Sequence, residues 1–160
     1  MKRVSRIFAK RFWIYIINMW TIANMFGLLS YYVFNKFHVQ INDYGIKFED
    51  IHIARLPWWA FREELIFRFL PFLLILLSKY QFSIRQTWSI MVVVSCIFGY
   101  MHGAVVAIFV QGVMGLYFAW IFWRYSFRLK NFKSLMVGLV ASTTVHFSYN
   151  LFVVVIQKIL

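Results

Sequence analysis

Five long apolar segments dominate this chain of 160 residues and restrict it to few folds. They are too long and too uniformly apolar for the alternating strands of a membrane barrel. A bilayer core about 30 Å thick needs about 20 helical residues to cross it. The segments therefore predict an all-α, polytopic membrane bundle of about five transmembrane helices, of which the third is short for a full crossing. Their ranges are 12–34, 58–78, 87–102, 104–123 and 135–156.

The composition excludes the soluble protein classes. Hydrophobic residues make up 62% of the chain and charged residues 14%, whereas a soluble domain is about half apolar and roughly a quarter charged. Disorder requires low hydrophobicity, and a disulfide-stapled domain requires more than the single Cys96. An integral, multi-pass protein of the cell membrane with one compact domain remains.

The formal net charge of +12 is explained by basic residues that flank the apolar segments, so nucleic acid is not an expected partner. The positive-inside rule then predicts an N-in, C-out topology, because eleven basic residues and no acidic residue fall on the inner side. These eleven are Lys2, Arg3, Arg6, Lys10, Arg11, Lys79, Arg85, Arg124, Arg128, Lys130 and Lys133.

Three regions follow from this pattern. Residues 1–34 form a basic N-terminus and a retained first span, and residues 58–160 form a core of four helices. Residues 35–57 form the one long connection, an interfacial loop on the outer side, with Trp58 and Trp59 after it in positions that suit the membrane interface. Two interpretations of this loop stay open, a lid and a plain connector.

The second apolar segment contains four charged residues. A charged side chain inside a transmembrane helix raises the free energy of insertion and usually marks a functional site. Glu64 and Arg68 are four residues apart, so they share a helix face and can pair. Glu63 points about 100° away from Glu64 and lacks a local partner, which suits a general base. The alternative is that these charges, Arg62 included, only stabilise a wet helix entrance.

Two further polar clusters interrupt the apolar segments. His102 ends the third segment between Gly99 and Gly103, and these glycines allow another backbone to approach closely. His146 and Asn150 are four residues apart, hence on one face of the fifth segment. Each cluster also has a purely structural interpretation. His102 would be an interfacial residue, and His146 and Asn150 would form polar contacts between packed helices.

The predicted topology brings the three clusters to one depth in the outer half of the membrane. Glu63 lies near the outer end of its segment, and His102 lies where the third segment exits. His146 and Asn150 lie roughly 16 and 22 Å from the inner start of the fifth segment. A glutamate, two histidines and an asparagine at matching depth predict a pocket that can activate water and stabilise an oxyanion.

The three clusters together resemble the motifs of the CAAX protease and bacteriocin-processing family of membrane-embedded, glutamate-type proteases. That family also contains the type II prenyl-protein endopeptidases. Its EExxxR, FxxxH and HxxxN patterns read here as 63–68, 98–102 and 146–150, in order and intact. The segment 111–115 is similar to the glycine-containing helix that the family places between the last two motifs. The resemblance covers residues 57–153.

The resemblance implies a role for each of these residues. Glu63 would act on water with help from His102, while His146 and Asn150 would stabilise the oxyanion. Glu64 and Arg68, with Phe98, would support the site. No metal or other cofactor is expected; the alternative is zinc held by Glu63, His102 and His146.

The expected function is that of an intramembrane endopeptidase whose site opens toward the outer face. Its partners would be the lipid bilayer and a substrate that is a membrane-inserted protein or a lipidated peptide, as in sorting-signal, precursor-peptide or bacteriocin processing. A non-proteolytic membrane scaffold or bacteriocin-immunity protein is the alternative, and a small transporter is disfavoured because the polar residues gather at one depth. The sequence leaves the oligomeric state open.

Overall fold

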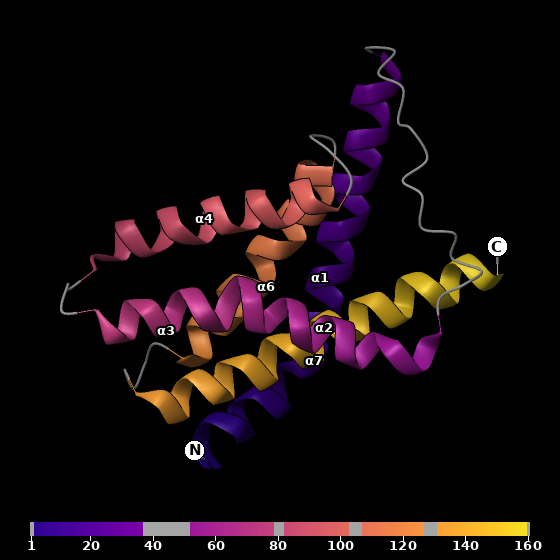
Figure 1. Ribbon diagram of the computed structural model, residues 1–160. Coiled ribbons are helices and arrows are strands. Elements are labelled where there is room, and N and C mark those ends of the chain that lie inside the picture. Colours follow the sequence, from indigo (N-terminus) through magenta and orange to yellow (C-terminus); the bar gives the residue numbers. More distant parts are fainter. Residues whose placement is uncertain (1, 37–51, 79–81, 103–106, 127–130, 160) are drawn as a thin grey trace.

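The computed structural model describes residues 2–36, 52–78, 82–102, 107–126 and 131–159, and every regular element within these ranges is helical. The predicted all-α class is therefore confirmed. The described residues form five helical rods (Figure 1). The rods are α1 (Lys2–Lys36); α2 (Leu56–Glu64) continuing through η3 (Leu65–Phe69) into α3 (Leu70–Leu77); α4 (Ile84–Met101); η4 (Ile108–Gly112) continuing into α6 (Val113–Ser126); and α7 (Phe132–Ile159).

Two of these helices are long and apolar enough to cross a membrane, over Ile84–Met101 and Phe132–Val155. They correspond to the third and fifth predicted spans. The count of about five crossings and the N-in, C-out orientation stay predictions. Residues 37–51 of the predicted outer loop lie outside the described residues, as does Gly103; the short 3-10 helix η2 (Ile53–Arg55) leads from the described end of that loop into α2.

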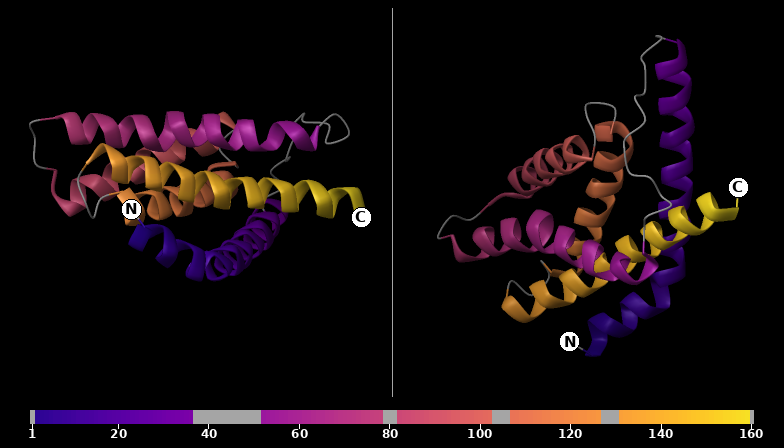
Figure 2. Two further views of the ribbon diagram at one scale, coloured as in Figure 1. Left: turned by 90° about the horizontal axis from the view of Figure 1, so that it is seen from below. Right: turned by 45° about the vertical axis from the view of Figure 1, so that its right-hand side comes forward.

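The rods pack around α6 and α7, which contact each other extensively. The α2–α3 rod and α7 run side by side in opposite directions, while α1 and α6 cross them (Figure 2). Helix α1 joins this bundle through Tyr15 and Met19, which are buried in one apolar cluster with residues of α6 and α7. The core thus fixes the relative positions of the helices that carry the three polar clusters.

The α2–α3 rod contains a wide turn, η3, just after the paired glutamates. The Leu70 N–H bonds to the Leu65 carbonyl, five residues back instead of four. Pro71 follows, and a proline inside a helix lacks an N–H and clashes with the carbonyl four residues before it. Widening the preceding turn relieves this clash, and such π turns are frequent at functional sites.

Helix α4 and the turn η4 approach so closely that their backbones nearly touch at two glycines. A Cβ atom added at Gly99 would lie 2.7 Å from the Gly112 nitrogen and 2.7 Å from the Ile108 Cα. Atoms that close cannot be accommodated because backbone atoms do not rotate away. The close approach expected at Gly99 is confirmed, and it sets the end of α4, with His102, beside η4.

Candidate active site

A buried ion pair forms the base of the site. Glu64 and Arg68 are fully buried, and Arg68 Nη1 lies 3.2 Å from Glu64 Oε1. The pairing predicted from their spacing is therefore present. Arg68 Nη2 also donates a hydrogen bond of 2.9 Å to the Gly115 carbonyl of α6. A Cβ at residue 115 would lie 2.9 Å from that same nitrogen, so glycine leaves the room that the guanidinium occupies.

Phe98 connects this base to the first histidine. Its ring is buried, with the Arg68 guanidinium 4.4 Å from the ring centroid, a distance at which a cation–π contact stabilises the pair. The Phe98 carbonyl lies 2.7 Å from His102 Nδ1, which makes Nδ1 the donor and turns Nε2 toward the pocket. The side chain predicted to support the site thus contacts two of its other members.

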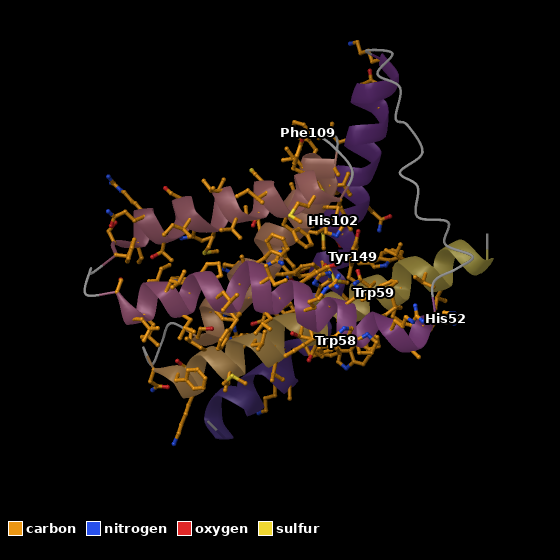
Figure 3. All side chains as sticks on the ribbon, in the orientation of Figure 1. His52, Trp58, Trp59, His102, Phe109 and Tyr149 are labelled. Carbon is orange, nitrogen blue, oxygen red and sulfur yellow. The ribbon has the colours of Figure 1, made fainter. Side chains whose placement is uncertain are left out.

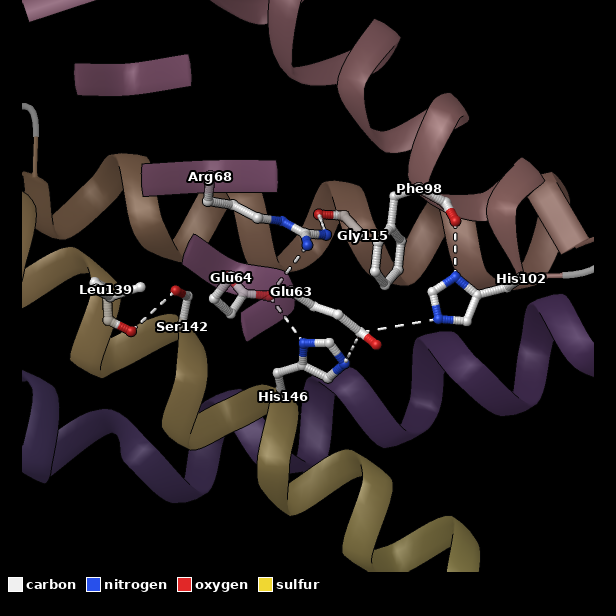
Figure 4. A network of polar contacts seen from close by, with 9 residues as sticks. All are labelled: Glu63, Glu64, Arg68, Phe98, His102, Gly115, Leu139, Ser142 and His146. Atoms are coloured by element: carbon white, nitrogen blue, oxygen red, sulfur yellow. Dashed lines mark hydrogen bonds and ion pairs between the residues drawn. The ribbon is translucent and has the colours of Figure 1, made fainter. Parts of the chain in front are cut away.

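Glu63 lies between the two histidines (Figure 4). Its Oε2 is 3.4 Å from His146 Nε2 and 3.8 Å from His102 Nε2. About one fifth of the Glu63 side chain is exposed, whereas Glu64 is not exposed at all. Of these two consecutive carboxylates, that of Glu63 is therefore partly exposed and that of Glu64 is buried.

His146 contacts both carboxylates at once. Its Nδ1 lies 2.9 Å from Glu64 Oε1, and because that oxygen belongs to a carboxylate paired with Arg68, Nδ1 is the donor. The Phe118 ring stacks on the imidazole with 4.4 Å between centroids and 18° between planes. The ring is buried and held on two sides, so its orientation relative to Glu63 is fixed.

These residues open into a pocket of about 160 Å³ between α2, α4, η4 and α7. Asn150 lines the pocket with Glu63, His102 and His146, so all four predicted catalytic residues meet there. Their catalytic roles stay predictions. Figure 3 shows Trp59, His102 and Tyr149 close together at this place. The lining residues are Leu56, Trp59, Glu63, His102, Gln111, His146, Tyr149, Asn150, Val153 and Val154.

Three polar or aromatic lining residues carried no site assignment in the sequence. Gln111 is a polar residue in an apolar segment, and that position was the one signal that could have marked it. Trp59 suited a membrane interface equally well, and Tyr149 sits inside the last motif without being one of its fixed positions. Their pocket-facing placement depends on how α2, η4 and α7 pack.

The donor set was also compared with the needs of a metal ion. Within the part of the chain that the structure describes, no three His, Cys, Asp or Glu side chains are arranged to hold one. Glu63 Oε2 lies 3.4 Å from His146 Nε2 and 3.8 Å from His102 Nε2. Zinc held by Glu63, His102 and His146 stays the alternative to the expected metal-free site. The site offers a carboxylate, imidazoles and carboxamides, which serve proton transfer and oxyanion stabilisation.

Comparison with known proteins adds the family. A family model described as type II CAAX prenyl endopeptidase Rce1-like matches residues 53–152, a range that runs from η2 into α7 and leaves out α1. No curated protein and no solved structure gives a significant match to the chain. The matched range contains all three polar clusters and amounts to well over half of the chain. This membrane protein therefore belongs to the type II CAAX prenyl endopeptidase Rce1-like family.

Proposed function

We propose that this chain is an intramembrane endopeptidase in which Glu63 activates water for attack on a peptide bond. The observation that carries the proposal is the position of Glu63: a partly exposed carboxylate on a pocket wall, with one histidine on each side. Membership in a peptidase family supports the reaction class. The position of Glu63 between the two histidines supports it as the group that activates the water.

In the proposed mechanism a water molecule in the pocket gives a proton to Glu63 as its oxygen bonds to the substrate carbonyl carbon. His102 Nε2, 3.8 Å from the carboxylate, helps to hold the water and Glu63 in line. The carbonyl oxygen becomes an oxyanion. When the C–N bond breaks, the proton on Glu63 passes to the leaving nitrogen, so that acid and base are the same group.

His146 and Asn150 are the proposed oxyanion donors. The Asn150 side-chain amide always carries N–H donors. The His146 Nδ1–H already donates to Glu64, so Nε2 can donate only when the ring carries a proton on both nitrogens. Loss of one oxyanion donor costs roughly 2.7–4 kcal/mol of transition-state stabilisation in serine proteases. A comparable loss is expected here for each donor.

Glu64 and Arg68 support the mechanism without contacting substrate. Both are fully buried, and Glu64 reaches the pocket only through its contact with His146. The ion pair therefore positions His146, while Arg68 links η3 to α6 through its hydrogen bond to the Gly115 carbonyl. Removing either partner would leave an uncompensated charge in an apolar interior.

The proposed substrate is a membrane-inserted or lipidated polypeptide that reaches the pocket from the outer face. The pocket wall made by Leu56, Trp59, Val153 and Val154 is apolar, which suits an apolar stretch of substrate beside the scissile bond. The inner-side excess of basic residues supports an outward-opening site. A sorting anchor, a precursor peptide or a bacteriocin leader would meet these requirements.

Comparison of polypeptide termini tests the function directly. Membrane and secreted fractions would be analysed by mass spectrometry from cells that express, at equal levels, the wild type, Glu63→Gln or Arg62→Gln. Arg62 is exposed and is not among the pocket residues, so its variant is a matched control on the neighbouring position. New termini are expected with the wild type and Arg62→Gln, and not with Glu63→Gln.

Identical termini in all three samples would reject the protease. If the biological effect of the protein also survived in Glu63→Gln, the pocket would belong to a non-proteolytic scaffold or immunity protein on the same fold.

A further inference from the structure

The helix ends fall into two groups at opposite ends of the molecule. Figures 1 and 2 place the starts of α1, α4 and α7 at one end, and the end of α1, the start of α2 and the end of α7 at the other. The first end, here called the basic end, carries basic residues and, by sequence, no acidic residue. Those whose side chains the structure describes are Lys10, Arg11, Arg85, Arg124 and Lys133.

Two of these cations converge from different helices. Tyr15 of α1 and Tyr125 of α6 share a hydrogen bond of 2.8 Å between their hydroxyls. Arg11 lies four residues before Tyr15 and therefore on the same face of α1. Arg124 directly precedes Tyr125 on α6. The tyrosine pair thus joins α1 and α6 next to both arginines.

Neither arginine is paired with a carboxylate among the described residues. This is unlike Arg68, whose charge is balanced by Glu64. The Arg124 guanidinium lies 5.3 Å from the centroid of the Trp120 ring, which limits the positions it can adopt. Arg11 is exposed. Without a carboxylate partner, both guanidinium groups keep their forked N–H donors available to an external anion.

We propose that Arg11 and Arg124 bind the phosphate of an anionic phospholipid headgroup at the junction of α1 with α6. Guanidinium groups match phosphate oxygens in paired hydrogen bonds. Trp120, which is partly buried beside Arg124, supplies an amphipathic aromatic side chain of the kind that occurs at headgroup level in membrane proteins. The inner leaflet supplies this ligand if the basic end faces the cytoplasm, as the sequence predicts.

The lipid would join a helix outside the range matched by the family model to a helix inside it. Arg124 lies inside the range matched by the family, whereas Arg11 lies on α1, outside it. Tyr117 adds a further link, since its hydroxyl donates a 2.9 Å hydrogen bond to the Tyr15 carbonyl. A bound headgroup would add a charge-dependent contact to the same junction and hold the leading helix on the peptidase core. This site is independent of the proposed peptidase activity.

Lipid binding by the purified full-length protein tests the proposal. Native mass spectrometry would measure the apparent Kd for phosphatidylglycerol in phosphatidylcholine-containing micelles. Arg11→Gln and Arg124→Gln are each expected to raise this Kd about fivefold, and the double variant about 25-fold, as each basic residue near an anionic surface contributes about one such factor. Lys10→Gln, about 100° round α1 from Arg11, and Arg55→Gln, at the opposite end, are expected to raise it clearly less than Arg11→Gln, because neither side chain belongs to the proposed site.

Three results would overturn the proposal. The first is equal binding of phosphatidylglycerol and phosphatidylcholine by the wild type. The second is an equal loss in Lys10→Gln and in the double variant, which would show general charge attraction only. The third is displacement of the lipid by millimolar inorganic phosphate, which would identify a free anion as the ligand.

Folding is checked through the melting temperature in phosphatidylcholine, which should stay within about 2 °C of the wild type. Should the double glutamine variant fail this check, Arg11→Lys with Arg124→Lys replaces it. Lysine keeps the charge and loses the forked geometry, so a Kd raised about fivefold is expected. An unchanged Kd would contradict a site built on paired hydrogen bonds.

Discussion

Glu63 and Glu64 are adjacent in sequence and have different surroundings. Glu63 has a side chain about one fifth exposed on the pocket wall, and Glu64 is closed in with Arg68 and His146. The helical step of about 100° accounts for the separation, since consecutive side chains cannot share a face. Each carboxylate therefore gives a different phenotype when its charge is removed.

Replacing Glu63 by glutamine should abolish cleavage and leave the fold intact. A loss of about 10²–10⁴-fold in product formation is expected, the range for a general acid–base group. The melting temperature in detergent should stay near that of the wild type, because the Glu63 side chain is already about one fifth exposed. A large drop in melting temperature would show that Glu63 is structural.

Replacing Glu64 by glutamine should have the opposite result. Arg68 would keep a buried charge without its partner, which typically destabilises a protein by about 3–5 kcal/mol. A lowered melting temperature and reduced protein in the membrane are the measurements. Wild-type stability in this variant would contradict a supporting role for the ion pair.

Gln111 is expected to contact the substrate. Its side chain lines the pocket and has no hydrogen-bond partner among the described residues, and a carboxamide can both donate and accept. Gln111→Leu should lower the yield of the new terminus about fivefold, the effect of one hydrogen bond of roughly 1 kcal/mol. Phe109→Leu, an exposed neighbour on η4, serves as the control and should retain the wild-type yield.

Metal chelation should leave the activity unchanged. The proposed reaction takes its base and its oxyanion donors from side chains alone, and no step uses a metal. The measurement is the rate of product formation by purified protein after dialysis against a chelator. A loss that zinc restores would favour the alternative in which Glu63, His102 and His146 are ligands.

At the level of the elements, two local features position the site. One is the wide turn η3, and the other is the close contact between α4 and η4 at Gly99. The close contact sets His102 opposite Gln111, because Gly99 allows α4 to approach η4 at backbone distance. Both features are local and would respond to single substitutions.

Gly99→Ala should destabilise the protein although alanine favours a helix. The gain in helix propensity is about 1 kcal/mol, whereas overpacking against rigid neighbours costs typically 1–3 kcal/mol. Two backbone atoms at 2.7 Å cannot move aside, so the clash is expected to dominate. The melting temperature measures the effect. Val93→Ala, at an exposed position of α4, should change it little, and a stabilised Gly99→Ala would contradict the close contact.

The sequence predicts the charged residues at the centre of the site, but it does not predict the residues that complete the pocket around them. Four-residue spacings predicted the Glu64–Arg68 pair, and the depth argument brought Glu63, His102 and His146 together. The π turns η3 and η4 were not predicted, because they arise from local crowding at Pro71 and from packing. For the same reason Trp59 and Gln111 could be placed in the pocket only by the three-dimensional structure.

For the whole molecule, the decisive property is the division of helix ends into a basic end and an opposite end. The described helix ends that flank the connections expected on the inner side lie at the basic end, and the pocket is formed by α2, η4, the end of α4 and the second half of α7. This arrangement agrees with a single orientation in which the pocket opens outward. That orientation stays a prediction.

Reporter fusions check the orientation. A reporter active only outside the cytoplasm should be active after residue 160 and inactive within the 79–81 connection. A reporter active only in the cytoplasm should give the reverse pattern. An outside location for the 79–81 connection would place the pocket on the inner face and transfer the proposed substrates to cytoplasmic lipidated termini.

The buried ion pair also has a consequence for the biogenesis of the protein. The α2–α3 rod carries four charges, each of which costs roughly 2.5–3.5 kcal/mol at the centre of an inserting helix. Two groups that hold these charges in the finished protein, the Gly115 carbonyl and His146, are synthesised later in the chain. The nascent second helix therefore leaves the ribosome before its partners exist. We expect chains truncated before α7 to be retained by the insertion machinery or degraded, so that folding of the site coincides with the end of translation.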